Sequence, residues 1–181
     1  MKKPSLILGS FLIIFILQIP ILYSKETKKI EGIAEVIDGD TLKIIGKKIR
    51  LFGIDAPEVK QRCKKYSISY LCGEESKNIL SVLVKDKIIT CFYKNKDMYG
   101  RILGICRNKN IKLFDEKLFK AGDVSTILKE INATMVLLGY AVSYKKYSKR
   151  YNTVEEIAKD GQIGLWIGEF EMPWEWRKKN K

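Results

Sequence analysis

The chain has 181 residues and a formal net charge of +13, and it contains no histidine. This length fits one domain of ordinary size, with enough residues to bury a core. The basic excess favours a polyanionic partner, either nucleic acid or an anionic membrane surface. The absence of histidine excludes Ser-His-Asp hydrolases and His-ligated zinc sites, so acid–base chemistry must fall to carboxylates, lysine, tyrosine or a metal-activated water.

The first 24 residues predict a targeting segment. Two lysines near the start precede the apolar run Leu6–Leu22, and Pro20 would break a helix close to its end, as in many secretory signals. The run also approaches the roughly 20 residues that a membrane span needs, so an uncleaved anchor stays open. We therefore expect export to the periplasm or out of the cell, with the segment either released or kept as a membrane tether.

Residues 25–181 predict a single domain made mainly of strands. Five short strands follow from runs of apolar residues, namely Ile30–Ile37, Leu42–Ile45, Ile49–Ile54, Lys87–Tyr93 and Arg101–Arg107. Three helices follow from apolar stripes and capping residues, namely Gly73–Lys85, Ile131–Tyr140 and Thr153–Gln162. Five strands with helices after the third and the fifth predict an α+β, mainly β, architecture. We expect an OB-fold, a five-stranded barrel with about three helices.

Three connections in this domain receive separate interpretations. Gly46-Lys47 predicts a tight hairpin, and Gln61–Cys72 a polar, basic loop. The lysine-rich stretch Asn108–Glu130 has a mixed pattern and is interpreted as an insertion. In the C-terminal tail, Trp174 and Trp176 are expected to dock the tail and have no catalytic role.

Acidic residues gather where two predicted strands meet turns. An Asp-Gly-Asp turn places its second acid, Asp40, at the start of a strand. Pro57 stops the next strand and leaves Asp55 at its rim beside the carbonyl group of Ala56. Two carboxylates and a carbonyl form an all-oxygen site that suits a hard cation such as calcium. Glu58 lies close enough in the chain to hold a water on that ion.

The side chain of Arg50 is not expected to point toward Asp55 in a regular strand. Arg50 precedes Asp55 by five residues, an odd offset, so in a regular strand the two side chains would point to opposite faces. A bulge or twist, for example at Gly53, would have to bring both to one site. Asp38, the first acid of the Asp-Gly-Asp turn, is predicted to cap that turn rather than to bind metal.

Three motifs in this order and spacing resemble the staphylococcal nuclease-like (thermonuclease) family, over roughly residues 29–176: Val-Ile-Asp-Gly-Asp-Thr at 36–41, Arg-Leu-Phe-Gly-Ile-Asp-Ala-Pro-Glu at 50–58 and Asp-Met-Tyr-Gly-Arg at 97–101. The resemblance implies an OB-type barrel and calcium-dependent hydrolysis of DNA and RNA to 3′-phosphate products. It implies a cation held by Asp40, Asp55 and the Ala56 carbonyl, a water oriented or deprotonated by Glu58, and a phosphate gripped by Arg50 and Arg101. Position 56 is often threonine in the family, a change that a backbone ligand should tolerate.

The four cysteines predict two disulfides. Cys91 and Cys106 lie equally far from the centre of a predicted hairpin, so they should face each other across it. That pairing leaves Cys63 with Cys72, and both bonds would suit an oxidising compartment. Four cysteines allow three pairings, and four reduced thiols stay open as well. The chain has no Cys-x-x-Cys pair, which argues against zinc.

A segment dense in tyrosine and lysine, Ala141–Tyr151, is a candidate nucleic-acid contact. Tyr144 and Tyr147 alternate with basic residues, a pattern that suits backbone contact together with base stacking. A solvated surface on which tyrosines cap the core accounts for the same pattern. Tyr99, within the third motif, is included as a third candidate for substrate binding.

Two other classes of function stay open. A non-catalytic OB-fold that binds nucleic acid would bind without calcium and form no product, but it leaves Glu58 and the carboxylate pair without a purpose. A membrane-tethered basic module acting on anionic lipid or envelope polymer would keep the Leu6–Leu22 span and lack affinity for nucleic acid. The nuclease interpretation accounts for more residues than either. We expect it to act on DNA and RNA as a monomer, with no protein partner.

Overall fold

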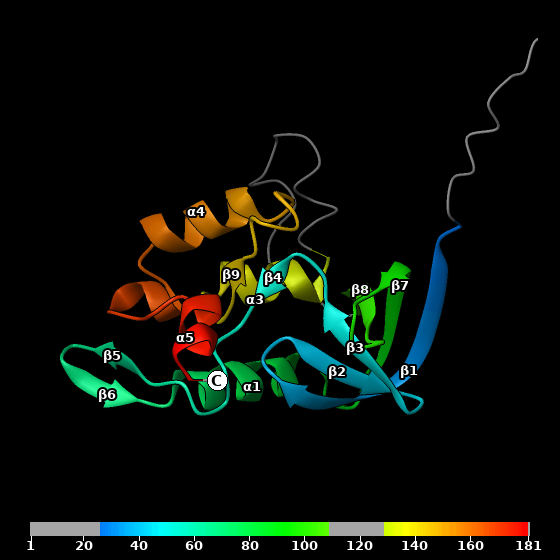
Figure 1. Cartoon of the computed structure of the whole chain (residues 1–181), viewed down its shortest axis with the longest axis horizontal. Coiled ribbons are helices and arrows are strands. Elements are labelled where there is room, and N and C mark those ends of the chain that lie inside the picture. Colours follow the sequence, from blue (N-terminus) through cyan, green and yellow to red (C-terminus); the bar gives the residue numbers. More distant parts are fainter. Residues whose placement is uncertain (1–25, 109–128, 181) are drawn as a thin grey trace, which may run out of the picture.

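The computed structural model describes residues 26–108 and 129–180 (Figure 1). The predicted targeting segment, residues 1–24, and most of the predicted Asn108–Glu130 insertion lie outside the described residues. Within the two described ranges, no helix is long and apolar enough to cross a membrane.

Five strands close into a barrel. They are β1 (Lys28–Asp38), β2 (Thr41–Ile44), β3 (Lys47–Leu51), β7 (Ile88–Lys96) and β8 (Ile102–Arg107). Around the barrel the order is β1-β2-β3-β8-β7, and β7 closes back onto β1. All neighbours are antiparallel except β3 and β8, which run parallel. This order is that of the predicted OB-fold, and the predicted α+β class is confirmed.

The barrel interior is filled by alternate residues of these strands. Leu42, Ile44, Ile49 and Leu51 are each fully buried, as the period-two pattern of the sequence requires. The predicted β2–β3 hairpin is present, with its turn at Ile45-Gly46, one position earlier than expected. Both turn residues have positive φ, 46° and 70°, which is the backbone of a tight hairpin turn.

The predicted third strand is not continuous to Ile54. β3 ends at Leu51, and the chain then turns through Gly53 into the short strand β4 (Ile54–Asp55), which pairs with β9 (Val142–Ser143). Gly53 has a φ of 81°, and a Cβ atom there would lie 3.0 Å from the ring of Tyr151. Glycine is therefore required at this turn on both steric and conformational grounds.

A buried asparagine holds this turn against the barrel. The side-chain amide of Asn132 donates to the carbonyl of Phe52, at 2.9 Å, and to that of Gly104, at 3.1 Å. Its oxygen accepts the backbone N–H of Cys106, at 3.0 Å. Every polar atom of this buried amide thus has a partner, which fixes where the chain leaves the barrel.

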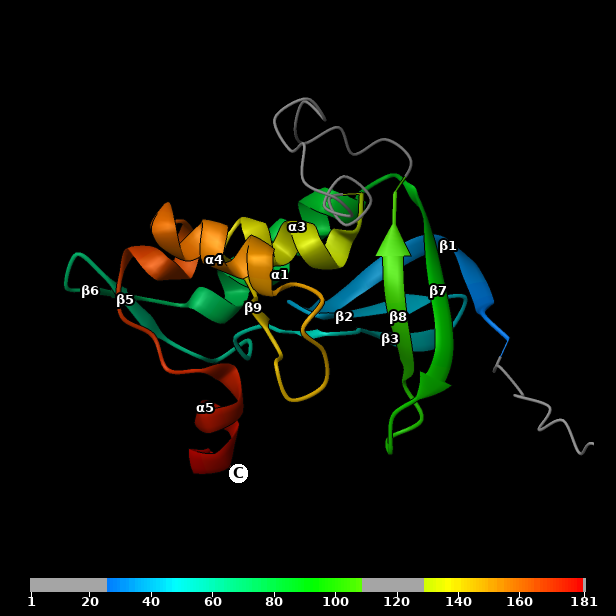
Figure 2. The ribbon, with the colours of Figure 1, turned by 90° about the horizontal axis from the view of Figure 1, so that it is seen from above.

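The helices lie beside the barrel, and the C-terminal helix projects away from the others (Figure 2). They are α1 (Cys72–Val84), α3 (Ile131–Leu137), α4 (Asn152–Asp160), the 3₁₀ turn η2 (Gly164–Ile167) and α5 (Pro173–Lys179). The three predicted helices correspond to α1, α3 and α4 within a few residues. The C-terminal helix α5 was not predicted, although it begins at Pro173, a favoured first helical residue.

Both predicted disulfides are present. Cys91 and Cys106 pair in register across β7 and β8, and Cys63 is bonded to Cys72. The predicted loop Gln61–Cys72 instead contains a hairpin, β5 (Cys63–Lys65) and β6 (Ile68–Tyr70), that ends next to the second bond. Two disulfides fit the oxidising conditions outside the cell or in the periplasm.

Removing the barrel disulfide should lower stability measurably. The double variant Cys91→Ala/Cys106→Ala should lose about 3 kcal/mol of unfolding free energy, because a bond closing a loop of this length restricts the unfolded chain. Urea denaturation of the parent and the variant under oxidising conditions measures the difference. Equal unfolding midpoints and slopes would contradict the expectation.

Glu130 is a second stabilising centre. Its fully buried carboxylate accepts hydrogen bonds from the hydroxyl of Tyr151, at 2.8 Å, and from the guanidinium groups of Arg150 and Arg107. Burial and the Glu130 charge raise the pKa of Tyr151, which therefore stays a donor. This network ties the start of α3 to the segment before α4.

Glu130→Gln should lower the unfolding free energy by about 3 kcal/mol or more, because two arginines then lose their buried counter-charge. Denaturant unfolding measures the loss. Glu156→Gln, at an exposed site paired with lysines, is the matched control and should change stability by less than about 0.5 kcal/mol. Similar losses in both variants would contradict this role.

Candidate active site

The two acids of the Asp-Gly-Asp turn have different tasks. The carboxylate of Asp38 accepts the backbone N–H of Asp40, at 2.9 Å, as predicted for a turn-capping residue. Burial, then the charge of Asp40, raise the pKa of Asp38 to about 6. The carboxylate of Asp40 is itself buried and accepts the backbone N–H of Ala56, at 3.1 Å. This bond joins the β1–β2 turn to the end of β4.

Arg50 and Asp55 do meet on one side of the chain. The guanidinium of Arg50 donates to Asp40, at 2.6 Å, and to Asp55, at 2.5 Å. The turn at Gly53 supplies the change of direction that the odd spacing demanded. Burial lowers the pKa of Arg50, but Asp40 and Asp55 outweigh it and raise the pKa above its ordinary value. Arg50 is thus held as a cation between two buried carboxylates.

A second guanidinium reaches this cluster from the C-terminal helix α5. Arg177 donates to the other oxygen of Asp55, at 2.7 Å, and to Glu58, at 2.9 Å. Burial raises the pKa of Asp55, and the contacts with Arg177 and Arg50 oppose that rise. Burial lowers the pKa of Arg177, but its bonds to Asp55 and Glu58 raise it overall.

A cavity of about 600 Å³ opens over these residues. Its walls include Arg50, Glu58 and Arg101, so the three predicted catalytic side chains share one space. Arg101 donates through Nε to Asp97, at 2.7 Å, rather than to the buried acids. Burial raises the pKa of Asp97, but the contacts with Arg101 lower it overall, so the pair stays charged. The cavity therefore carries cationic groups on two of its sides.

Aromatic side chains form the remaining wall. Tyr99, Tyr144, Tyr147 and Trp174 all line the cavity. Tyr144 stacks on Trp174 with ring centres 5.3 Å apart and planes 3° apart, whereas Tyr99 and Tyr147 are 77% and 60% exposed. The three predicted substrate-binding tyrosines are thus together. Their neighbour Tyr151 is a core residue, fully buried.

The oxygen atoms available at this site suit a hard cation. Two buried carboxylates, Asp40 and Asp55, lie near enough for the charge of one to raise the pKa of the other, and the Ala56 backbone adjoins both. Only oxygen donors are offered, which suits calcium or magnesium. Among residues 26–108 and 129–180, no group of three Asp, Glu or Cys side chains is drawn together as a ready metal site. The carboxylate oxygens of Asp40 and Asp55 instead accept hydrogen bonds from guanidinium groups.

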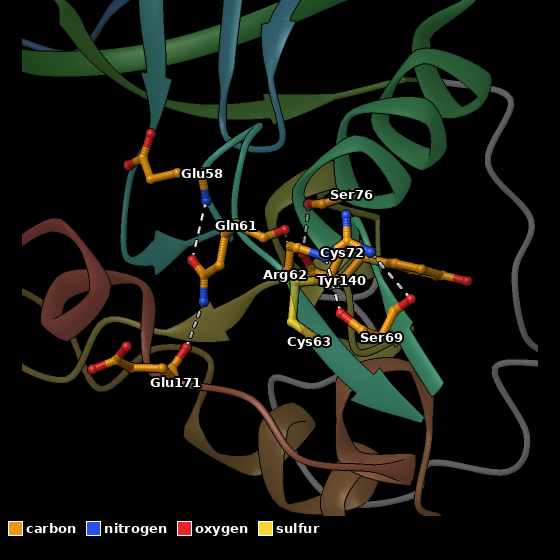
Figure 3. The surroundings of a disulfide bond; sticks show 9 residues. All are labelled: Glu58, Gln61, Arg62, Cys63, Ser69, Cys72, Ser76, Tyr140 and Glu171. Atoms are coloured by element: carbon orange, nitrogen blue, oxygen red, sulfur yellow. Dashed lines mark hydrogen bonds between the residues drawn. A yellow bond between two sulfur atoms is a disulfide. The ribbon is translucent and has the colours of Figure 1, made fainter. Parts of the chain in front are cut away.

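The loop that carries Glu58 is fastened to the C-terminal segment (Figure 3). Gln61, fully buried, accepts the backbone N–H of Glu58, at 3.3 Å, and donates to the carbonyl of Glu171, at 2.7 Å. The Cys63–Cys72 disulfide lies beside the backbone carbonyl of Gln61, whose oxygen is 3.4 Å from the Cys72 sulfur (Figure 3). The position of Glu58 thus depends on the docking of a segment more than a hundred residues away.

An OB-type barrel with buried carboxylates, guanidinium groups and aromatic side chains around one cavity suits a phosphodiester substrate. Residues 48–168 match the family model described as staphylococcal nuclease homologue, and the chain belongs to this family. It is therefore a nuclease of the hydrolase class.

Individual relatives are similar over most of the chain, and two of the three given below are nucleases by name. An uncharacterized endonuclease of Haemophilus influenzae is 32% identical over all of this chain and 89% of its own length. A micrococcal nuclease of Shigella flexneri is 28% identical over 82% of this chain and 80% of its own length. The succinoglycan biosynthesis protein ExoI of Rhizobium meliloti is 32% identical over 75% of this chain, which spans 63% of that relative.

Sequence reasoning missed Arg177 and Gln61. Arg177 follows two tryptophans in the tail, and the sequence predicts only a docking role for that tail. Trp174 does dock it, on Tyr144, but it also lines the cavity. A buried glutamine within an apparently polar loop carries no signal in the sequence, since nothing local marks it as buried.

Proposed function

We propose that the protein is a calcium-dependent, exported nuclease that hydrolyses DNA and RNA at the cavity bounded by Arg50, Glu58 and Arg101. The observation that carries this proposal is the convergence of these three side chains on one cavity next to the buried pair Asp40 and Asp55. A cavity lined by several basic side chains suits a phosphodiester, and the paired acids suit a cation.

Each residue would have a separate task. Asp40, Asp55 and the Ala56 carbonyl would hold calcium, which supplies Lewis-acid polarisation of a phosphate oxygen when bound. Glu58, 35% exposed at its side chain, can accept the proton of an attacking water. Arg50 and Arg101 would hold the phosphate from two sides with planar donors whose hydrogen bonds strengthen as negative charge grows. Cleavage of the P–O5′ bond then leaves a 3′-phosphate.

The aromatic wall would receive the bases. Tyr99 and Tyr147 present exposed rings, and such rings stack on any base because every base has a π-face. This contact favours unpaired strands without selecting a sequence. We propose single-stranded DNA and RNA as the preferred substrates, handled by a monomer outside the cytoplasm.

Product analysis tests the proposal. Purified protein should convert a labelled single-stranded oligonucleotide, with calcium present, into fragments whose 3′ ends block extension until a phosphatase removes the phosphate. An oligonucleotide that is bound but stays intact would instead support the non-catalytic OB-fold binding module. Fragments with free 3′ hydroxyl groups would contradict the proposed direction of cleavage.

A further inference from the structure

The C-terminal segment that carries α5 is docked by contacts of several kinds onto parts of the chain outside the barrel strands. Trp174 stacks on Tyr144, and the carbonyl of Glu171 accepts a hydrogen bond from Gln61. Met172 and Trp174 pack against a small core made by Leu165, Val142 and the Cys63–Cys72 disulfide. None of these contacts is an ion pair, so the two ion pairs that α5 makes with Asp55 and Glu58 need their own explanation.

Arg177 differs from the other basic residues of α5. Lys178 and Lys179 pair with Glu175 and Glu171 of the same C-terminal segment. Arg177 instead reaches across to Asp55 and Glu58, which lie more than a hundred residues earlier in the chain. It is directed at the site rather than at its own helix.

Arg177 contacts the carboxylate oxygens that the proposed reaction needs. Arg50 donates to one oxygen of Asp55 and Nη2 of Arg177 donates to the other, while Nη1 of Arg177 contacts Glu58. The fully buried Asp55 therefore has a guanidinium on each oxygen. A cation that binds Asp55 must compete with one of these groups.

Of the two arginines that contact Asp55, Arg177 is the easier to displace. Its side chain is 31% exposed, against 16% for Arg50, and it lies on a terminal helix that ends at the cavity. Arg50 is further restrained, because it also holds Asp40. Displacing Arg177 would free one oxygen of Asp55 together with the contacted oxygen of Glu58 and leave the Arg50 bridge in place.

We propose that Arg177 is an internal counter-ion of the catalytic carboxylates, which holds Asp55 and Glu58 in position and is displaced when a divalent cation binds. This inference rests on the proposed function, because it takes Asp55 as a cation ligand. Arg177 is thus a positioning residue, and the C-terminal helix sets how tightly the site binds its cation. Once displaced, the guanidinium remains at the cavity that receives the phosphate.

Calcium titration by calorimetry, without any substrate, tests this role on the full chain. Arg177→Met keeps the aliphatic stem and removes the charge, so calcium affinity should rise about tenfold or more, since a like charge a few ångströms from the ion is lost. Arg177→Lys, which keeps the charge, should stay closer to the parent. Lys179→Met removes the same charge from the same helix but away from the acids, and should change affinity by less than about twofold.

Equal or weaker calcium binding by Arg177→Met would overturn the inference, as would an equal rise in Lys179→Met. Tryptophan fluorescence and thermal unfolding verify that α5 stays docked, and Arg177→Gln replaces the methionine variant if it does not. The proposed function fails separately, when the parent leaves DNA intact in calcium. A parent that cleaves DNA, together with a variant that binds calcium no more tightly, contradicts the counter-ion role alone.

Discussion

Glu58→Gln should reduce the rate of DNA cleavage by about 10²–10⁴-fold, because the amide cannot accept the proton of the attacking water. The side chain is 35% exposed and its backbone N–H is held by Gln61, so the amide should occupy the same place. Single-turnover cleavage of a labelled oligonucleotide in saturating calcium measures the chemical step without product release.

Glu175→Gln is the matched control. This glutamate lies on α5, is 45% exposed and pairs with Lys178, so the same change of atoms occurs outside the catalytic cluster. Its cleavage rate should equal that of the parent. A Glu58→Gln variant that also cleaves at the parent rate would remove Glu58 from the reaction and leave the water without a base.

Arg101→Ala should lower the cleavage rate by about a thousandfold, as expected for an arginine that stabilises charge at a phosphoryl centre. The fold should persist, because Arg101 lies on the wall of the cavity and its ionic partner Asp97 is also near the surface. Arg101→Lys restores the charge but not the planar pair of donors, so most of the loss should remain. Single-turnover cleavage, with circular dichroism as a fold check, measures both variants.

Arg62→Ala controls for the general loss of positive charge. Arg62 lies next to β5 and contacts Ser69 of the same hairpin, and it is not among the residues that line the cavity. Its removal should change cleavage by less than about twofold, since its charge is exposed and screened by salt. Equal losses in the Arg62 and Arg101 variants would mean that Arg101 contributes only general attraction for nucleic acid.

The barrel was predictable because its signals are local. Apolar alternation marks each strand, and the equal distances of Cys91 and Cys106 from a turn fix their register. The β5–β6 hairpin was missed, since its turn uses Tyr66 and Ser67 at φ values of 51° and 66°. A tyrosine in the left-handed region gives no turn signal in a sequence.

The catalytic cluster was predictable as far as it is encoded in short motifs. Asp40, Arg50 and Asp55 lie within sixteen positions of one another and meet in the structure, although the sequence left open how Arg50 and Asp55 reach one side of the chain. Arg177 was missed because the contact depends on tertiary docking, 122 positions from Asp55. Tyr147 and Tyr151 look alike in sequence, and only the fold shows that Tyr151 is fully buried and bonded to Glu130 whereas Tyr147 is exposed.

One measurement tests most directly the claim that a cation-assisted phosphodiester site lies at this cavity. Single-stranded DNA is incubated with the purified parent chain in calcium, in excess chelator, and in chelator followed by calcium in excess. We expect fragments in the first, intact DNA in the second and restored cleavage in the third. Fragments of equal yield in chelator would contradict the role of the Asp40 and Asp55 carboxylates as cation ligands, and intact DNA in all three would contradict the nuclease itself.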